Sequence, residues 1–452
     1  MGFRKKLEKR RKFEFLPFIM GKRIFIFEYV SGGGFNKDEI PISLFCEGFG
    51  MLVALIKDFK SLGYEVCTLI DYRIYHLSTI LPNDNRIIVK KDDNFLNHFK
   101  ILVKDSDYSF IIAPDSRNVL YNLTRIVKKY NKILLSIDLE GIVIGSSKMN
   151  TYDFFKKNKL LTPKTYLIPF KKNKLDSNFI IQKFGDLKKT IIIKPEDGVG
   201  AESIFLFETK EQIENFFQDY YSKIDTKRSY ILQEYIEGKD LSISLIGLQE
   251  SLNNEFKNPF ILTTNSQNVN IKNPKYESEY LGGYTPINNY QQITRELTEI
   301  LEKVDLSSFS GYFGIDLIRS EDSKYYFIEI NPRLTTSYIG IRNVLNQNPS
   351  KLILESNLGH SMPRDLKVQF TSIFRRLDLE YMKSNLGKEL KVDLINHLMR
   401  LIPELVTPPI SLNESNQFTC FIATKTKDLT SSNRRMQKIH QILRTLSFEI
   451  VK

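Results

Sequence analysis

Residues 311–316 read Gly-Tyr-Phe-Gly-Ile-Asp, and residues 327–333 read Phe-Ile-Glu-Ile-Asn-Pro-Arg. Aromatic and β-branched residues dominate both stretches, which favours β-strands. The polar run 320–324 lies between them and favours a turn, which we place with Asp322 and Ser323 at its centre. This part of the chain therefore predicts a β-hairpin, and the rest of the sequence can be interpreted outward from it.

The predicted hairpin register brings two carboxylates together. Asp316 lies directly opposite Glu329, with Cβ atoms roughly 5 Å apart, and Asn331 lies on the same face two residues further along. Opposed like charges destabilise a sheet, so the pair needs a counter-charge. Three oxygen ligands suit Mg²⁺ or Mn²⁺ and do not suit zinc. Taken alone, this spacing is more often a wet strand face without a metal, and the other motifs decide between the two interpretations.

The bulk properties are those of a globular protein with ample cores. At 452 residues, with 42% hydrophobic and 26% charged residues, the chain is long enough for two or three domains. The three cysteines form no CxxC pair and the five histidines form no ligand cluster, which argues against a disulfide scaffold or a zinc site and suits the reducing cytoplasm. The absence of about 18 consecutive apolar residues predicts no membrane span.

The net charge of +12 is unevenly distributed. Residues 1–19 hold seven Lys or Arg and two acidic residues, so this tail carries +5, the difference of the two counts. We predict a disordered basic tail that lacks the apolar core of a signal peptide. A nucleic-acid or membrane-surface role for the tail is the less favoured alternative.

Residues 20–140 alternate between short apolar runs and helical periodicity. We predict strands at 24–30, 66–70, 109–114 and 133–137, and helices at 44–62 and 116–130. Such alternation predicts a parallel, doubly wound α/β sheet, in which ligands bind beyond the carboxyl ends of strands. The triple glycine 32–34 follows the first strand, and it fits a phosphate or substrate loop and a flexible turn equally well.

The pattern changes after residue 140. Strands expected at 190–194, 203–207, 230–236 and 241–247 follow one another with few helices, which indicates an antiparallel sheet and an α+β fold. Residues 251–280 are rich in Asn, Ser and Lys and predict a long loop or irregular insertion. Beyond residue 365 we predict a closing β/α appendage with a helix at 388–404, a strand at 418–423 and a helix at 429–446.

Two glycine-containing segments suggest phosphate binding with different strength. Residues 141–148 resemble a P-loop only superficially, because the glycine spacing is three and Lys148 is displaced from the second glycine. Lys194, in contrast, ends a strong strand and precedes a small-residue loop with Gly198 and Gly200, whose backbone amides can approach a polyphosphate. Alone, this second segment is equally compatible with a surface lysine and an ordinary hairpin loop.

Residues 229–240 predict a strand that enters a turn. A strand edge can offer alternating N–H and C=O groups to a purine ring, and a nearby carboxylate can hold ribose hydroxyls. Without other motifs, an ordinary strand–turn–strand is the better interpretation.

The order and spacing of these segments resemble the ATP-grasp superfamily, which includes D-alanine–D-alanine ligase and biotin carboxylase. The resemblance covers about residues 140–340. With residues 27–34 and 281–286, the chain looks most like the archaeal-type tyramine–glutamate ligase group. The resemblance implies a Rossmann-like pre-ATP-grasp domain at residues 20–140. An ATP-grasp domain with antiparallel sheets would follow at residues 141–365, with a lid subdomain at about 150–230. The C-terminal β/α appendage would span residues 366–452.

The resemblance also implies a role for each motif. Lys148 and Lys194 would bind the phosphates of ATP, Lys194 also acting in catalysis, under a loop with Gly198 and Gly200. Gln233, Glu234 and Ile236 would hold adenine, and Asp240 the ribose. Asp316, Glu329 and Asn331 would carry one or two Mg²⁺ (or Mn²⁺) ions, and Arg333 would act in catalysis by facing the reacting phosphate and carboxylate. Some relatives have Arg where this chain has Gly314, and Arg333 or Arg319 is expected to substitute.

The function implied is that of an ATP-dependent carboxylate–amine ligase that works through an acyl phosphate. Its partners would be a small-molecule carboxylate such as an amino acid and a small amine, with glutamate and tyramine as the pair that the resemblance suggests, and residues 262–288 would shape their pocket. A homodimer is compatible with this, whereas a membrane role is not expected. Two alternatives remain open: a non-catalytic nucleotide-binding or nucleic-acid-associated protein, supported by the basic tail and Gly314, and an ATP-grasp carboxylase.

Overall fold

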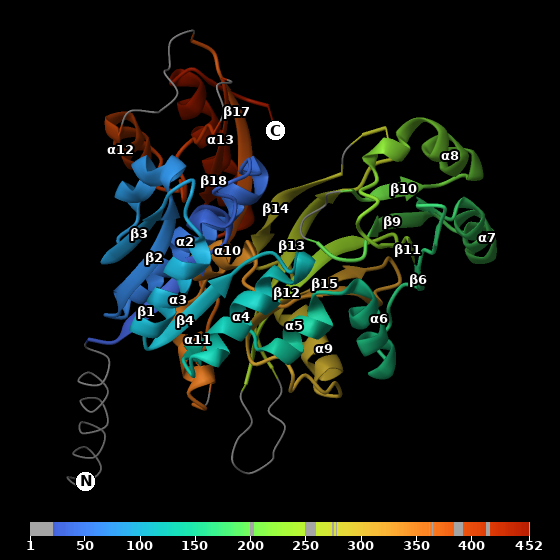
Figure 1. Ribbon diagram of the computed structural model, residues 1–452, viewed down its shortest axis with the longest axis horizontal. Helices are drawn as coiled ribbons and strands as arrows, with labels where there is room; N and C mark the ends of the chain where they lie inside the picture. The colour runs from blue at the N-terminus through green and yellow to red at the C-terminus, as the bar shows by residue number, and fades with distance from the viewer. Residues whose placement is uncertain are drawn as a thin grey trace.

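Five parallel strands form the first sheet of the computed structural model (Figure 1). In the order β3-β2-β1-β4-β5, they span Asn85–Val89, Glu65–Asp71, Arg23–Glu28, Tyr108–Ile112 and Ile133–Leu134. Helix α2 (Ile42–Ser61) covers one face, while α3 (Phe95–Asp105) and α4 (Val119–Lys129) cover the other. The structure describes residues 21–198, 203–248, 259–273, 275–276, 278–360, 362–363, 365–383, 392–412 and 416–451, so the predicted tail 1–19 and Gly200 lie outside the described residues.

The alternation along β1 explains why this sheet is covered on both faces. Ile24 and Ile26 belong to the core that includes α2, whereas Phe25 and Phe27 belong to the core that includes α3 and α4. Adjacent strand residues point to opposite faces, so a continuous apolar run requires two apolar layers. The predicted doubly wound α/β sheet is confirmed, although β3 and α3 were not predicted and the first strand ends at Glu28 rather than at residue 30.

A four-stranded antiparallel sheet forms the lobe at the right of Figure 1. Its order is β10-β9-β11-β6, with bounds Phe205–Phe207, Ile191–Pro195, Tyr230–Glu234 and Thr165–Leu167. The helices α7 (Ser177–Leu187) and α8 (Lys210–Asn215) pack onto it through a separate apolar core, and the small hairpin β7 (Phe170–Lys171) and β8 (Lys174–Leu175) precedes α7. This lobe places the end of β9, with Lys194, toward the centre of the molecule.

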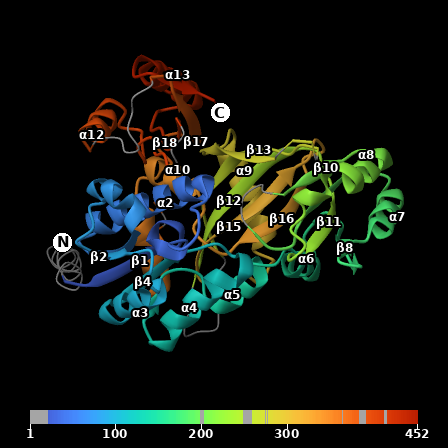
Figure 2. The same ribbon diagram turned by 45° about the horizontal axis from the view of Figure 1, so that its top comes forward.

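The largest sheet has eight strands and runs through the middle of the molecule (Figure 2). In the order β16-β15-β12-β13-β14-β17-β18, they span Tyr325–Asn331, Gly311–Arg319, Lys239–Gly247, Phe260–Asn270, Glu279–Thr285, Ser372–Tyr381 and Gln417–Ala423; β19 (Phe448–Ile450) also pairs with β17. Helices α5 (Leu139–Gly145), α6 (Lys148–Lys157) and α9 (Tyr290–Leu301) pack near β12, β15 and β16, and α10 (Ser337–Val344) and α11 (Pro349–Asn357) near α2. Antiparallel sheets beside a parallel one confirm the predicted combination of α/β and α+β architecture.

The prediction of a long loop at 251–280 is wrong for residues 260–270, which form β13. This strand is polar yet central, and its buried polar side chains are paired with those of neighbouring residues. Asn265 Nδ2 donates to Ser244 Oγ at 3.1 Å, and Thr263 Oγ1 donates to Asn265 Oδ1 at 2.8 Å. Polar composition therefore indicated a loop where lateral hydrogen bonds stabilise a strand.

The predicted hairpin register is confirmed, but the predicted turn is wrong. Asp316 pairs with Glu329, as expected. The turn, however, has three residues between Ser320 and Lys324, whose backbones pair, and a register shift between Asp316 and Leu317 restores the expected opposition. The extra turn residue and the β-bulge compensate for each other.

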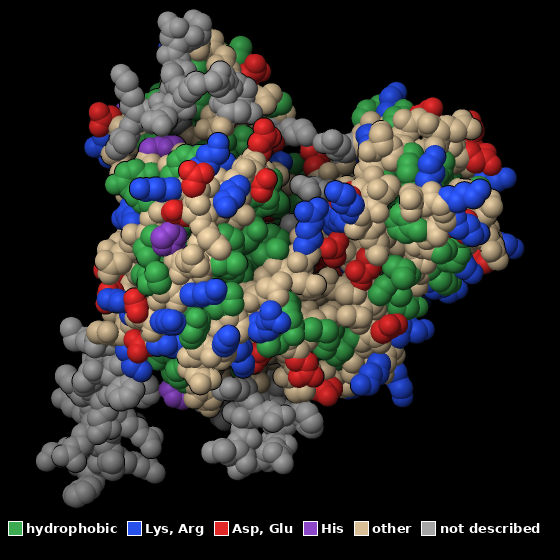
Figure 3. Space-filling model, viewed as in Figure 1, with side chains coloured by type: hydrophobic (Ala, Val, Ile, Leu, Met, Phe, Trp, Pro, Cys, Tyr) green, Lys and Arg blue, Asp and Glu red, His purple; other side chains and the backbone are tan. Residues whose placement is uncertain are grey.

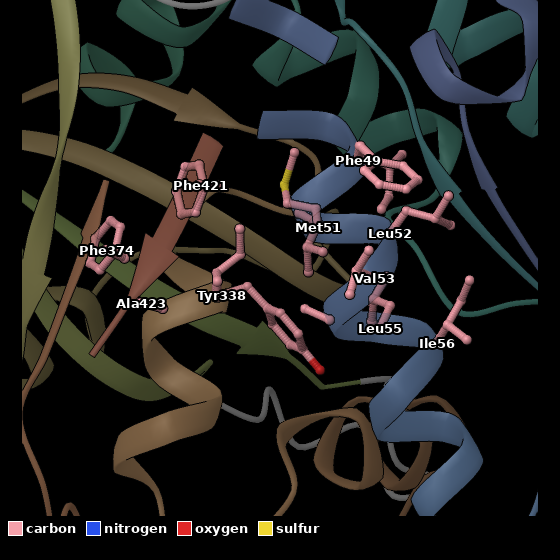
Figure 4. Packing of buried hydrophobic residues seen from close by; sticks show 14 of the residues in the cluster. Phe49, Met51, Leu52, Val53, Leu55, Ile56, Tyr338, Phe374, Phe421 and Ala423 are labelled. Atoms are coloured by element: carbon pink, nitrogen blue, oxygen red, sulfur yellow. The ribbon is translucent and has the colours of Figure 1, made fainter. Parts of the chain in front are cut away.

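The C-terminal segment extends the large sheet rather than standing apart from it. β17 pairs with β14, and β18 pairs with β17. The predicted helices at 388–404 and 429–446 correspond to α12 (Val392–Leu401) and α13 (Leu429–Thr445). Figure 4 shows Phe374 and Phe421 of β17 and β18 beside Tyr338 of α10 and the apolar side chains of α2. One core therefore joins the N-terminal sheet to the C-terminal strands of the large sheet.

No helix in the described ranges is long and apolar enough to cross a membrane.

Candidate functional site

A cavity of about 450 Å³ lies where the three sheets meet. Figure 3 shows the surface hollowed between the lobe of the four-stranded sheet and the rest of the molecule. The walls come from the carboxyl ends of β1 and β4, from β9 and β11, and from the inner strands of the large sheet. The parallel sheet reverses its strand order between β1 and β4, so its contribution lies at the topological switch point where such sheets bind ligands.

Ten of the predicted site residues line this one cavity: Lys148, Lys194, Gln233, Glu234, Ile236, Asp240, Asp316, Glu329, Asn331 and Arg333. Gly198 lies beside it, because its carbonyl accepts a hydrogen bond from Lys148 Nζ at 3.4 Å. The described structure therefore brings together motifs that are spread over almost 190 positions, from 148 to 333.

The Asp316–Glu329 pair is buried and electrostatically strained. Burial and the charge of Glu329 raise the pKa of Asp316 to about 7. Asp316 accepts hydrogen bonds from Gln267 Nε2 at 2.8 Å and from Asn331 Nδ2 at 3.0 Å. Burial also acts to raise the pKa of Glu329, but the charges of Lys148, Lys194 and Arg333 outweigh it and the pKa falls.

Two lysines face these carboxylates. Lys148 is the first residue of α6, and its Nζ lies 3.7 Å from Glu329 Oε2. Lys194 is 5% exposed, and burial lowers its pKa to about 8, with Lys148 acting in the same direction. Two cations held this close to two carboxylates can bind a polyphosphate and the counter-ions that it carries.

The glycines of the rejected P-loop pattern have a packing role. A Cβ at Gly141 would lie 2.6 Å from the carbonyl oxygen of Ser308, and one at Gly145 would lie 2.7 Å from Pro332 Cδ. Gly141 thus lets α5 approach the segment at Ser308, and Gly145 lets it approach the turn that carries Arg333. The structure thus agrees with the rejection of that motif.

Of the two arginines expected to compensate for Gly314, only Arg333 lines the cavity. Its NH2 donates to Asn331 Oδ1 at 3.3 Å, and its Nε lies 3.9 Å from Asp115 Oδ2. Arg319 instead donates to Ser323 Oγ at 3.1 Å, near the hairpin turn. A side chain at position 314 would meet Thr335, since a Cβ there would lie 2.9 Å from Thr335 Cγ2.

The wall between β11 and the hairpin is apolar with polar ends. Ile192, Ile236, Ile318 and Ile328 line it. The side chains of Gln233 and Glu234 are engaged within the lobe: Gln233 Nε2 donates to Thr165 Oγ1 at 2.9 Å, and Glu234 accepts from Lys189 and from the backbone of Lys164. Burial raises the pKa of Asp240 to about 6. This wall can hold a flat apolar ring, with backbone groups of β11 rather than the Glu234 carboxylate facing it.

Several lining residues were not predicted individually. Gln267 and Tyr280 fall within residues 262–288, which were expected to shape the pocket, but Glu28 and Glu47 come from the N-terminal sheet and its helix α2. Glu28 lies four residues before the triple glycine 32–34 and within residues 27–34, which carried part of the resemblance, and this was the available signal. No sequence signal indicated Glu47, because its place in the cavity wall depends on how α2 packs across the sheet.

The donor set fits a magnesium ion. Asp316, Glu329 and Asn331 converge as hard oxygen donors, and burial together with the charge of Glu329 raises the pKa of Asp316, an effect that a bound cation would oppose. The described residues contain no cluster of three or more His, Cys, Asp or Glu that could hold a metal alone. Two carboxylates completed by phosphate oxygens and water are the arrangement that Mg²⁺ commonly takes.

Comparison with known proteins agrees with this geometry. Residues 145–337 match the family model described as an ATP-grasp domain, and residues 64–142 match the model described as a pre ATP-grasp 3 domain. The tyramine–L-glutamate ligase of Methanocaldococcus jannaschii is 28% identical over 331 residues, which cover 72% of this chain and 86% of that protein.

Solved structures show the same fold. An ATP-grasp superfamily protein from Archaeoglobus fulgidus has a TM-score of 0.56 at 22% identity, covering 89% of this chain and 100% of that chain. The biotin carboxylase domain of Hydrogenobacter thermophilus 2-oxoglutarate carboxylase has a TM-score of 0.66 at 12% identity, covering 95% and 91% of the two chains. The family models, the relative and the fold agree with the resemblance seen in the sequence, and the chain contains an ATP-grasp domain at residues 145–337 that follows a pre-ATP-grasp domain at residues 64–142.

Proposed function

We propose that this protein is an ATP-dependent carboxylate–amine ligase that forms a C–N bond through an acyl phosphate. The observation that carries the proposal is the convergence of two lysines, two opposed carboxylates and one arginine in one cavity that also has an apolar wall. The relative named tyramine–L-glutamate ligase supports this reaction class. An amino-acid carboxylate and a small primary amine, with L-glutamate and tyramine as the first pair to try, are the proposed substrates in the cytoplasm.

Each group then has a role in positioning and in charge stabilisation. Ile192, Ile236, Ile318 and Ile328 hold the adenine ring, and Asp240 holds the ribose. Lys148 and Lys194 hold the phosphates, with the loop at Gly198 above them. Asp316, Glu329 and Asn331 hold one or two Mg²⁺ ions, which neutralise phosphate charge when bound.

The chemistry is a pair of displacements. A carboxylate oxygen of the acid substrate attacks the γ-phosphorus, and ADP leaves as the acyl phosphate forms. The substrate ammonium gives up one proton to solvent to become the free amine, and its nitrogen then attacks the acyl carbon. The C–O bond to phosphate breaks, and the departing phosphate takes the second proton from the nitrogen. Arg333 faces the developing negative charge, and the protein acts by orientation and electrostatics rather than through a covalent nucleophile.

Release of ADP from ATP, with Mg²⁺, acid and amine present, tests the proposal. We expect ADP formation to need all three, and Glu329→Gln to lower the rate at least about 100-fold. Glu65→Gln is a matched control, because Glu65 pairs with Arg23 at the start of β2, away from the cavity. Equal rates for wild type and Glu329→Gln would overturn the metal assignment, and ADP formation independent of any acid would overturn the ligase assignment.

A homodimer remains a separate proposal. Light scattering during size-exclusion chromatography distinguishes a dimer from a monomer.

A further inference from the structure

Glu28, at the carboxyl end of β1, is a buried carboxylate on the cavity wall. It is 2% exposed, yet it lines the cavity. Its Oε1 accepts from the backbone N–H of Val30 at 3.0 Å, and its Oε2 accepts from the N–H of Ser31 at 2.7 Å and from Ser31 Oγ at 2.6 Å. Among the described residues, no Lys, Arg or His forms an ion pair with it, and burial raises its pKa to about 7.

The triple-glycine segment is built to hold this carboxylate. Residues Val30–Gly34 form a single tight turn in which Gly33 has a φ of 92°. A Cβ at Gly32 would lie 2.5 Å from the Phe27 ring, and one at Gly33 would lie 2.7 Å from Val89. The backbone N–H groups of Val30 and Ser31 are directed at Glu28, so this part of the turn holds a carboxylate at the cavity wall and does not offer these groups to a phosphate.

Helix α2 holds the carboxylate from the other side. A Cβ at Gly48 would lie 2.5 Å from Glu28 Oε1, so glycine is required for this close approach. The neighbouring Glu47 also lines the cavity, and its Oε1 lies 3.8 Å from Arg376 NH1 on β17. The C-terminal part of the large sheet thus contributes to this wall.

The cavity is polarised by these placements. The lining residues from β1, α2 and β4 include two carboxylates and no basic side chain in the described ranges, whereas the basic lining residues Lys148, Lys194 and Arg333 come from α6, β9 and the turn after β16. The acidic side is otherwise apolar, with Val30, Leu44, Met51, Ile112, Ala113 and Pro114. Such a surface suits a cation on an apolar body and repels a second anionic group.

This acidic side lies close to the reacting groups. Tyr280 of β14 lines the cavity, and its pKa is raised by burial and further by the charges of Glu47 and Asp316. Tyr280 OH also forms a hydrogen bond with Thr336 Oγ1 at 2.9 Å, next to the turn that carries Arg333. Tyr280 therefore connects the part of the acidic side at Glu47 with Asp316 and with the turn that carries Arg333.

We propose that Glu28 binds the ammonium group of the amine substrate, and that Val30, Leu44 and Met51 cover its apolar body. This assignment rests on the proposed ligase function and specifies the substrate class as a primary amine with an apolar body. Glu47, held by Arg376, forms the second acidic wall of the subsite. The acid substrate lies on the other side, toward Arg333.

Trapping with hydroxylamine separates the two half-reactions. Hydroxylamine attacks the acyl phosphate directly and forms a hydroxamate, so it reports activation of the acid without a bound amine. With L-glutamate as acid and tyramine as amine, we expect Glu28→Gln to raise the KM for tyramine about 10- to 100-fold, since a charge-assisted hydrogen bond is lost. The rate of hydroxamate formation and the KM values for ATP and L-glutamate should change less than about threefold. Glu65→Gln should resemble wild type throughout.

A second variant separates loss of the Glu28 charge from a change in the structure of the turn Val30–Gly34. Gly48→Ala keeps the Glu28 charge but displaces its carboxylate, and it should raise the KM for tyramine in the same assay without lowering the melting temperature of the ATP-bound protein. A loss of hydroxamate formation through a raised KM for L-glutamate would overturn the proposal, because Glu28 would then bind the amino group of the acid. An unchanged KM for tyramine in both variants would overturn it as well. A wild type that forms neither hydroxamate nor ADP would overturn the ligase function itself.

Discussion

Asp316 on β15 and Glu329 on β16 lie directly opposite each other, and the register shift beside them adds Ile328 to the same cavity wall. Consecutive strand residues normally point to opposite faces, but the extra residue of a bulge can share a face with its neighbour. The three-residue turn alone would place Ile328 opposite Asp316. The bulge therefore keeps the carboxylate pair and also provides an apolar side chain next to it.

Ile328→Ala should weaken nucleotide binding without removing the response to Mg²⁺. Losing the apolar contact costs about 1–2 kcal/mol, which corresponds to a rise of about 5- to 30-fold in the KM for ATP. Ile101→Ala is a suitable control, because Ile101 is a 48% exposed isoleucine on α3. Steady-state ADP release at varied ATP measures the effect, and equal KM values for the two variants would show that Ile328 does not contact the nucleotide.

The parts of the site that the sequence predicted are those fixed by local pattern. Lys194 ends an apolar strand, and Asp316 and Glu329 lie in two strand-forming runs separated by a short polar turn, so their placement follows from alternation and chain length. Even there, the turn and the bulge were missed, because a pattern of residue types fixes which side chains share a face more firmly than it fixes how many residues form the turn.

The parts that the sequence did not predict depend on contacts between distant segments. β13 is a strand because Asn265 finds a polar partner in Ser244 on β12 and Thr263 finds one in Asn265 on its own strand, and composition alone does not show those partners. Glu47 reaches the cavity because α2 packs against β17 and β18 from the other end of the chain. The same packing explains how the closing β/α appendage predicted at residues 366–452 joins the large sheet through β17.

Lys194 should give the ATP-binding step a dependence on pH. Its pKa is lowered to about 8, mainly by burial, so the side chain is charged below that pH and loses its proton above it. Because only the cation attracts phosphate, kcat/KM for ATP should fall above about pH 8, approaching tenfold per pH unit. Lys194→Met should have a low kcat/KM with a flat profile over the same range. A wild-type profile that stays constant to pH 9.5 would contradict this assignment.

Asp115 is expected to position Arg333. It is 6% exposed at the end of β4, and its Oδ2 lies 3.9 Å from Arg333 Nε. Asp115→Asn should lower kcat about 3- to 10-fold with little change in the KM for ATP, because the guanidinium is less firmly oriented. The melting temperature should hold or rise, since burying a neutral amide costs less than burying a carboxylate. A drop in melting temperature with unchanged kcat would instead indicate a purely structural role.

Asp58 on α2 should stabilise the contact between the N-terminal sheet and the ATP-grasp domain. It is 5% exposed and accepts hydrogen bonds from Arg342 NH2 at 2.6 Å and from Tyr338 OH at 2.7 Å, both on α10. Asp58→Asn should lower the free energy of unfolding by about 3–5 kcal/mol, because it leaves the half-buried guanidinium of Arg342 without a counter-charge.

The exposed pair of Lys60 and Asp84 provides the control for this measurement. Their side chains are 31% and 35% exposed, so Asp84→Asn should cost less than about 1 kcal/mol. Urea unfolding followed by tyrosine fluorescence gives both values. Asp58→Leu combined with Arg342→Met should recover part of the loss, because an apolar pair of similar volume removes the unpaired charge. If Asp58→Asn and Asp84→Asn cost the same, the contact between α2 and α10 depends on apolar packing around Tyr338 rather than on the Asp58–Arg342 ion pair.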